Sequence, residues 1–130
     1  GDCPFIDPKI VDSIVKLYKS GNFDYVSNTL LPTFPDGLDT EEFSMNSLKK
    51  ANLNATSKYD KEHVTPYLKR NKFIRRENFT SKIDNSSLRL TLDTKVDYEN
   101  IKKIYKYFKN NFSVGSDDVI KAINEKKNKY

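Results

Sequence analysis

The stretch GDCPFIDPKIVDSIVKLYKSGNFDYVSN, Gly1 to Asn28, decides the fold class because it predicts a helix followed directly by a strand. Asp7 can cap the helix, and the proline after it suits the first helical position. Apolar residues at helical spacing then continue until Gly21, so the predicted helix spans Pro8–Ser20. After the glycine, a tyrosine–valine pair favours a short strand at Phe23–Asn28.

The same alternation continues along the chain. An extended segment is expected at Leu38–Phe43, and Ser44 can cap a helix that runs to about Asn54. LRLTLD, residues 88–93, alternates three leucines with polar residues and predicts a strand at Leu88–Leu92. The other predicted elements are a helical turn at Thr65–Pro66, a strand at Phe73–Phe79, a helix capped by Thr94 and a short helix capped by Ser116.

Strands that alternate with helices predict an α/β architecture. The chain has only four glycines, and none forms the Gly-rich loop that binds phosphate near the start of doubly wound sheets. The sequence therefore predicts the α/β class without that nucleotide-binding motif in residues 1–130.

Composition indicates a folded domain, or part of one, of 130 residues. Hydrophobic residues make up 36% of the chain, which is enough for a modest core. No apolar run is long enough to cross a membrane and no signal-peptide pattern is present, so no membrane partner is expected. The single cysteine, Cys3, cannot form an internal disulfide, and a reducing, cytoplasmic location is expected.

The formal net charge of +5 comes from lysines that become frequent toward the C-terminus, including Lys129. A solvated, basic helical tail at residues 109–130 is the favoured interpretation, because charged helix faces usually face water. A tail that binds polyanions is the alternative. The sequence lacks a recognised nucleic-acid-binding motif, so no nucleic-acid partner is expected.

Two carboxylates are candidates for a metal site. Asp93 closes the predicted strand LRLTLD, and Asp2 lies in a turn directly before a helix. Ligands bind at the carboxyl ends of strands in open α/β sheets, and Mg²⁺ prefers oxygen ligands. Spacing alone leaves both interpretations open, because an aspartate after a strand is more often a helix cap or a turn former.

Two further segments allow more than one interpretation. The FPDGLD loop can form a β-turn, and Asp36 and Asp39 around Gly37 can accept hydrogen bonds from sugar hydroxyls. His63, in KEHVT, can act as a general base or be a structural residue, and the structural interpretation is favoured. An inert thiol is expected at Cys3, since no neighbour clearly lowers its pKa.

Four motifs in this order resemble the spore coat polysaccharide biosynthesis branch of the cytidylyltransferases, which is similar to the CMP-sialic acid and CMP-KDO synthetases. The resemblance covers residues 1–108. The motifs are GDCPFIDPKIVD, DYVSNTLLPTFPDGLDTEEFS, YDKEHVTPYL and LRLTLDTKVDYENIKKIY.

The resemblance implies a Rossmann-like, glycosyltransferase type A-like three-layer sandwich. It also implies a magnesium-dependent enzyme that joins CTP to a sugar, often a sugar acid, and releases pyrophosphate. The motif acids Asp2 and Asp93 correspond to catalytic magnesium ligands in this family. The positions that match the family's substrate-binding segments are Asn28, Pro35, Asp36, Gly37, Asp39, Glu62, His63 and Arg89.

The resemblance also predicts a division of the chain. Residues 1–108 correspond to the C-terminal half of the catalytic domain, and the N-terminal nucleotide-binding half of the family is expected to be missing. We therefore expect little transfer by this chain alone. The unpaired sheet edge that such a half would leave favours a homodimer, and a non-catalytic oligomerisation or binding module is the alternative function.

Overall fold

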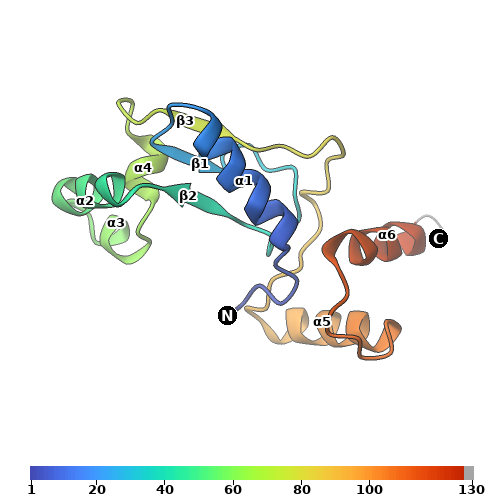
Figure 1. Ribbon diagram of the computed structural model, residues 1–130. Coiled ribbons are helices and arrows are strands. Elements are labelled where there is room, and N and C mark those ends of the chain that lie inside the picture. Colours follow the sequence, from blue (N-terminus) through green and yellow to red (C-terminus); the bar gives the residue numbers. More distant parts are fainter. Residues whose placement is uncertain (128–130) are drawn as a thin grey trace.

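The computed structural model describes residues 1–127 and contains a three-stranded sheet with helices on both faces (Figure 1). The strand order is β2-β1-β3. The central strand β1 (Tyr25–Ser27) is antiparallel to β2 (Glu41–Phe43) and parallel to β3 (Arg76–Asn78). This arrangement agrees with the predicted α/β class.

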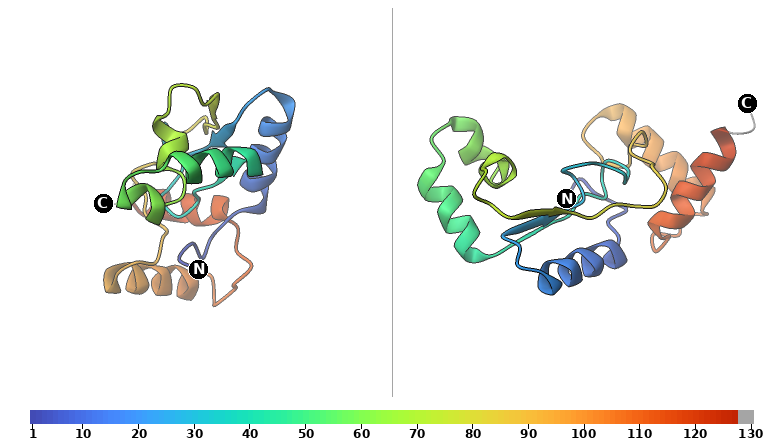
Figure 2. Two further views of the ribbon diagram at one scale, coloured as in Figure 1. Left: turned by 90° about the vertical axis from the view of Figure 1, so that its left-hand side faces the viewer. Right: turned by 90° about the horizontal axis from the view of Figure 1, so that it is seen from above.

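Helix α1 (Pro8–Ser20) has the predicted bounds and covers one face of the sheet. The backbone N–H of Lys9 donates to the side chain of Asp7 at 2.8 Å, which confirms the predicted N-cap. The buried Ile10 and Ile14 of α1 belong to the same core cluster as Val26 of β1. Figure 2 shows α1 alongside the sheet when the molecule is seen from above.

The opposite face of the sheet is covered by α2 (Met45–Asn54) and α4 (Pro66–Arg70). Tyr25 of β1 is fully buried there in a second cluster, whose other buried members are Ala51, Leu68 and Ile74. Successive residues of β1 therefore supply two different cores, because side chains alternate across a strand. Ser44 caps α2 as predicted, by accepting from the backbone N–H of Ser47 at 3.0 Å.

Two C-terminal helices complete the first core. Helix α5 (Lys95–Tyr107) begins with a capping box formed by Thr94 and Asp97, which confirms the predicted cap. Helix α6 (Ser116–Lys127) contributes the fully buried Val119 to the cluster that contains α1. In Figure 1, α5 and α6 lie together on one side of the sheet region.

The segment 109–130 is therefore not wholly a solvated tail, since part of α6 is core. Its boundary at residue 108 stays a prediction, and Lys129 lies outside the described residues. The predicted cap at Ser116 is wrong: Ser116 is the first residue of α6, and its buried hydroxyl donates to the Asp7 carboxylate at 2.5 Å.

The strand predicted at Leu88–Leu92 is also wrong. This segment forms only an isolated parallel bridge between Arg89 and Asp36. The segment that pairs with it contains the tight turn around Gly37. Only Asp36 is therefore paired, and no ladder of hydrogen bonds forms. Burial follows the predicted alternation only from Leu88 to Leu90, where Arg89 is exposed between two buried leucines; Thr91 is buried as well, and Leu92 is half-buried.

Three further segments differ in extent from their predictions. The strands predicted at Phe23–Asn28 and Phe73–Phe79 shorten to three residues each. A short helix that was not predicted, α3 (Lys58–Glu62), is capped by Ser57, whose side chain accepts from the backbone N–H of Asp60 at 3.1 Å. None of the helices within residues 1–127 has the length and apolar character that a bilayer crossing requires.

Candidate active site

The predicted site residues gather mainly at one edge of the sheet. Strands β1 and β3 are parallel, so their carboxyl ends share this edge. Asn28 follows β1 directly, and the loop that carries Asp36 and Asp39 connects β1 to β2. Ligands of α/β proteins bind outside this edge, so a site here stays the prediction that the sequence made.

The FPDGLD loop forms a β-turn at residues 35–38. The backbone N–H of Leu38 donates to the carbonyl of Pro35 at 3.1 Å, so the proline is the first residue of the turn and Gly37 the third. Gly37 has a φ of 101°, the left-handed conformation that the third position of a type II turn requires. A Cβ at Gly37 would lie 2.6 Å from Leu90 C and from Thr91 N, so the loop depends on glycine for close contact as well.

Asn28 holds this loop against the sheet. Its Nδ2 donates to the carbonyl of Leu38 at 2.8 Å, and the backbone N–H of Thr40 donates to its Oδ1 at 2.8 Å. Asn28 and Pro35 are both buried. Both residues therefore shape the loop in this structure, and a direct contact with substrate stays a prediction for each.

Arg89 joins three carboxylates at the centre of the site. Its Nη1 donates to Asp36 Oδ2, and its Nη2 donates to Asp93 Oδ2 at 2.7 Å. Its Nε donates to Asp97 Oδ1 at 2.9 Å, and its Nη2 also reaches Asp97 Oδ2 at 3.1 Å. The cluster places Asp36 and Asp93 near each other although 57 residues separate them in the chain.

Asp97 was not among the predicted site residues. Hydrogen bonds from the Arg89 guanidinium hold the pKa of the Asp97 carboxyl well below its usual range, so it remains charged. The capping pattern Thr94–x–x–Asp97 was visible in the sequence, but it indicated only a helix start. Its pairing with Arg89 depends on the turn between LRLTLD and α5, which sequence spacing did not fix.

The segments that carry Asp2 and Asp93 meet at this edge. The backbone N–H of Leu92 donates to the carbonyl of Asp2 at 2.8 Å, and the Thr91 hydroxyl donates to the same oxygen at 3.1 Å. Asp93 therefore follows directly after Leu92, whose backbone is hydrogen-bonded to the backbone of Asp2. The side chain of Asp2 is exposed, and its one hydrogen bond within residues 1–127 is a weak contact, at 3.6 Å, that it accepts from the thiol of Cys3.

The donors at this edge suit magnesium. Mg²⁺ takes oxygen ligands and is usually bound by one or two carboxylates plus phosphates and waters. Asp2 offers an exposed carboxylate, and among the described residues Asp93 Oδ1 accepts no hydrogen bond. Within residues 1–127 no group of three or more His, Cys, Asp or Glu side chains is arranged to hold an ion, so the fit rests on two carboxylates.

Acidic side chains set the electrostatic potential around Cys3. Burial, followed by the neighbouring carboxylates of Asp2, Asp39 and Asp36, raises the pKa of the Cys3 thiol. Burial and the Asp36 carboxylate likewise raise the pKa of Asp39. A protonated thiol is a poor nucleophile, which agrees with the predicted inert cysteine. The local negative potential favours a cation.

Glu62 and His63 lie on a different part of the surface, at the end of α3. His63 is exposed, and its ring lies 4.5 Å from that of Tyr59. His63 lines a cavity of about 590 Å³ together with Glu41 and Lys69. Glu41 and Lys69 form an ion pair at 2.5 Å. Glu41 begins β2 two residues after Asp39, so this cavity adjoins the strand that follows the acidic loop.

The backbone next to His63 is strained. Val64 has a φ of 61°, which is disfavoured for a β-branched residue, and the Thr65 N–H donates to the His63 carbonyl at 2.6 Å across it. Such conformations cluster at functional sites. The strain therefore supports a role for this segment, although Glu62 and His63 are not part of the cluster around Arg89.

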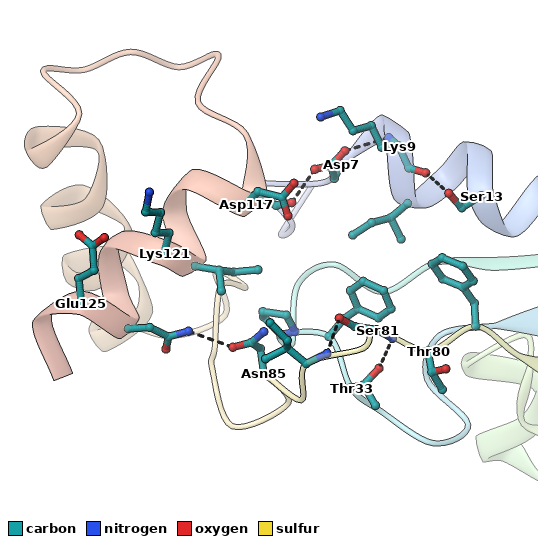
Figure 3. Close-up of a pocket in the computed structure, with 18 residues that line it drawn as sticks. Asp7, Lys9, Ser13, Thr33, Thr80, Ser81, Asn85, Asp117, Lys121 and Glu125 are labelled. Atoms are coloured by element: carbon teal, nitrogen blue, oxygen red, sulfur yellow. Dashed lines mark hydrogen bonds between the residues drawn. The ribbon is translucent and has the colours of Figure 1, made fainter. Parts of the chain in front are cut away.

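Another cavity, of about 620 Å³, lies between α6, the start of α1 and residues 79–85 (Figure 3). Many of its polar groups are already paired. The Ser81 N–H donates to Thr33 Oγ1 at 2.7 Å, and Asn124 Nδ2 donates to Asn85 Oδ1 at 3.1 Å. The acidic edge, where exposed carboxylates face solvent, is therefore the better candidate for the active site.

The sequence pattern of a family described as cytidylyltransferase matches residues 1–126. The chain belongs to the cytidylyltransferase family. The match extends to residue 126 near the end of α6, beyond residue 108 where the resemblance inferred from the sequence ends.

Similar proteins agree with this family. The chain is 30% identical over 128 residues to the spore coat polysaccharide biosynthesis protein SpsF of Bacillus subtilis, covering 95% of this chain and 52% of that protein. It is 34% identical over 113 residues to the uncharacterised protein MJ1063 of Methanocaldococcus jannaschii, covering 83% of this chain and 44% of that protein. The chain thus spans about half the length of these relatives.

A solved structure agrees as well. The chain matches a cytidylyltransferase from Leptospira borgpetersenii serovar Hardjo-bovis with a TM-score of 0.90 and 32% identity, covering 98% of this chain and 54% of that one. Together these similarities confirm the resemblance on which the sequence prediction rested. They also confirm the fold as that of a cytidylyltransferase.

Proposed function

We propose that this chain carries the acidic side of an active site that transfers a cytidylyl group from CTP to a sugar. The observation that carries the proposal is the meeting of two distant motifs. The backbone N–H of Leu92 donates to the carbonyl of Asp2 at 2.8 Å, at the sheet edge where Asp36 and Asp39 lie.

In the proposed reaction, a hydroxyl oxygen of the sugar forms a bond to the α-phosphorus of CTP. The bond from that phosphorus to the departing pyrophosphate breaks, and the hydroxyl proton is released. Asp2 and Asp93 would hold magnesium, which when bound offsets negative charge on the phosphates. Catalysis of this kind consists mainly of positioning and electrostatic stabilisation.

The proposed roles of the other residues follow from where they lie. Asp36 and Asp39 would accept hydrogen bonds from sugar hydroxyls, and Asn28, Pro35 and Gly37 would shape their loop. The remaining proposed substrate contacts are Glu62, His63 and Arg89.

We further propose a sugar acid as acceptor and surface polysaccharide biosynthesis in the cytoplasm as the setting. The name of the Bacillus relative supports the polysaccharide part of this proposal. Sialic, legionaminic, pseudaminic and KDO-like acids are the acceptors to compare, with a neutral sugar beside them. Since residues 1–130 contain no Gly-rich phosphate loop, we expect this chain alone to show little or no transfer.

Binding of the divalent ion and the nucleotide tests the proposal directly. Titration with Mn²⁺, alone and with CTP, should give saturable binding that Asp93→Asn and Asp2→Asn each weaken at least tenfold. Asp12→Asn, on the exposed surface of α1, removes the same charge and should leave binding unchanged. Equal binding by all four proteins would contradict the proposed site, and release of pyrophosphate from CTP with the acceptors above measures activity.

A second proposal is a non-catalytic oligomerisation module, with a homodimer as the expected assembly. The observation in its favour is the set of large apolar side chains on the surface, among them Leu53 at 82%, Phe73 at 80% and Phe112 at 76% exposure. Light scattering at several concentrations tests it. A mass that stays at one chain throughout would exclude self-association.

A further inference from the structure

We infer that Asp97, acting through Arg89, is a positioning residue of this site, which holds the carboxylates of Asp36 and Asp93 together until a divalent cation binds. The inference rests on the proposed function, since it concerns the same cation. It adds a residue that was not among the predicted site residues, and it assigns Arg89 a role toward the carboxylates.

The geometry of Asp97 carries the first step. Its side chain is only 6% exposed, and its Oδ2 accepts from the backbone N–H groups of Asp93 at 3.1 Å and Thr94 at 2.9 Å. These bonds fix the carboxylate at the first turn of α5. Its Oδ1 then accepts from Arg89 Nε at 2.9 Å, which sets the plane of the guanidinium.

The two carboxylate oxygens of Asp97 separate positioning from helix capping, because Oδ1 holds Arg89 and Oδ2 caps the helix. The capping box needs only Oδ2, which accepts from the N-cap backbone. Among the described residues, the only hydrogen bond to Oδ1 comes from Arg89. An asparagine could therefore keep the cap, but it would remove the charge and the acceptor that hold Arg89.

The other donors of Arg89 point to solvent-exposed partners. Nη1 donates to Asp36 and Nη2 to Asp93, whose side chains are 45% and 49% exposed. One guanidinium thus lies among three negative charges, and only its bond to Asp97 is shielded from water. An ion at Asp93 can compete for that exposed carboxylate, while the Asp97 contact keeps Arg89 in place.

This arrangement predicts opposite effects for the two partners. Arg89→Ala removes a positive charge close to the ion site, so Mn²⁺ should bind about threefold to tenfold more tightly. Asp97→Asn removes a negative charge and leaves Arg89 held only by Asp36 and Asp93, so Arg89 competes more strongly with the ion for Asp93, and Mn²⁺ should bind about threefold to tenfold more weakly. Asp118→Asn, an exposed acid in the first turn of α6, is the matched control and should change nothing.

A measurement without metal tests the positioning step by itself. In the metal-free 130-residue chain, the Arg89 Nε–H resonance should exchange with water at least tenfold more slowly than that of the exposed Arg76. Asp97→Asn should abolish this protection. Arg89→Lys keeps the positive charge but lacks the planar guanidinium that can donate to three carboxylates at once. This variant should therefore bind Mn²⁺ more tightly than wild type but less tightly than the Arg89→Ala variant.

The outcomes separate this inference from the proposed function. If wild type binds Mn²⁺ but both Asp97→Asn and Arg89→Ala leave the affinity unchanged, the positioning role is wrong and the proposed site stands. If wild type does not bind Mn²⁺, the proposed function fails, and the exchange rate of Arg89 alone then decides whether Asp97 positions it. An Arg89 Nε–H that exchanges as fast as that of Arg76 overturns the inference in either case.

Discussion

Asp36 and Arg89 are paired twice: across an isolated bridge, whose main-chain hydrogen bonds join Asp36 to the residues on either side of Arg89, and through their side chains. The Asp36 N–H donates to the Leu88 carbonyl at 3.0 Å, and the Leu90 N–H donates to the Asp36 carbonyl at 2.7 Å. The same two residues form an ion pair. Since this is an isolated bridge, the position of the acidic loop depends on a few contacts, and single substitutions should disturb it measurably.

Gly37→Ala should destabilise the protein and displace the loop. A Cβ at this position would lie 2.6 Å from backbone atoms of Leu90 and Thr91, and the φ of 101° is unfavourable for alanine. We expect a loss of about 1–3 kcal/mol in the free energy of unfolding, the usual cost of such strain. Chemical denaturation monitored by circular dichroism measures it.

Gly115→Ala is the matched control, because a Cβ there would meet no atom within 4 Å. Its free energy of unfolding should stay within about 0.5 kcal/mol of wild type. Equal stability of the two variants would show that the approach of Gly37 to residues 90–91 is not as close as described.

Asn28→Ala should be at least as costly. The substitution removes the partners of the Leu38 carbonyl and the Thr40 N–H in a buried region. Each buried group left without a partner costs about 1–3 kcal/mol, so we expect a loss of about 2–4 kcal/mol in the free energy of unfolding. Asn46→Ala, on the exposed surface of α2, should be nearly neutral, and a similarly small effect at Asn28 would contradict its role in the loop.

Local sequence signals predicted the helices well. Caps at Asp7, Ser44 and Thr94 each form the expected hydrogen bond, because capping involves residues only two or three positions apart. The Leu88–Leu92 strand was predicted wrongly because alternation reports burial, whereas a strand also needs an extended partner. Here the partner is a turn at Gly37.

The candidate site shows the same limit. The motif positions Asp36, Arg89 and Asp93 could be named from the sequence, and the structure brings them together. Their connection through Asp97 could not be predicted, because it depends on how LRLTLD turns into α5. Glu62 and His63 also came from a motif, but the fold places them at the end of α3, where His63 lines a separate cavity with Lys69.

Low pH should weaken the ion pair between Asp24 and Arg75, which joins the residues directly before β1 and β3. Arg75 donates to the Asp24 carboxylate from Nε at 2.9 Å and from Nη2 at 3.0 Å, and these bonds lower the pKa of Asp24 to about 2. A carboxyl with a lowered folded-state pKa stabilises the fold above its unfolded pKa near 3.8, and this contribution disappears as the pH falls toward 2.

Asp24→Asn should therefore lower the stability near neutral pH and reduce its dependence on pH between about 4 and 2. Thermal unfolding across this range, compared with Asp12→Asn on α1, measures the difference. Parallel curves for wild type and Asp24→Asn would contradict the assigned pairing.

Val119→Ala tests whether α6 belongs to the folded core. The side chain of Val119 is fully buried in the cluster that contains Ile10 and Ile14 of α1. Removing two methyl groups there should reduce the free energy of unfolding by about 1.5–3 kcal/mol. Val96→Ala is the control, because Val96 is 68% exposed on α5 and its truncation should change stability by less than about 0.5 kcal/mol. If Val119→Ala were as mild as Val96→Ala, α6 would contribute little to the fold, and the basic segment after residue 108 would behave as the solvated tail that its composition suggested.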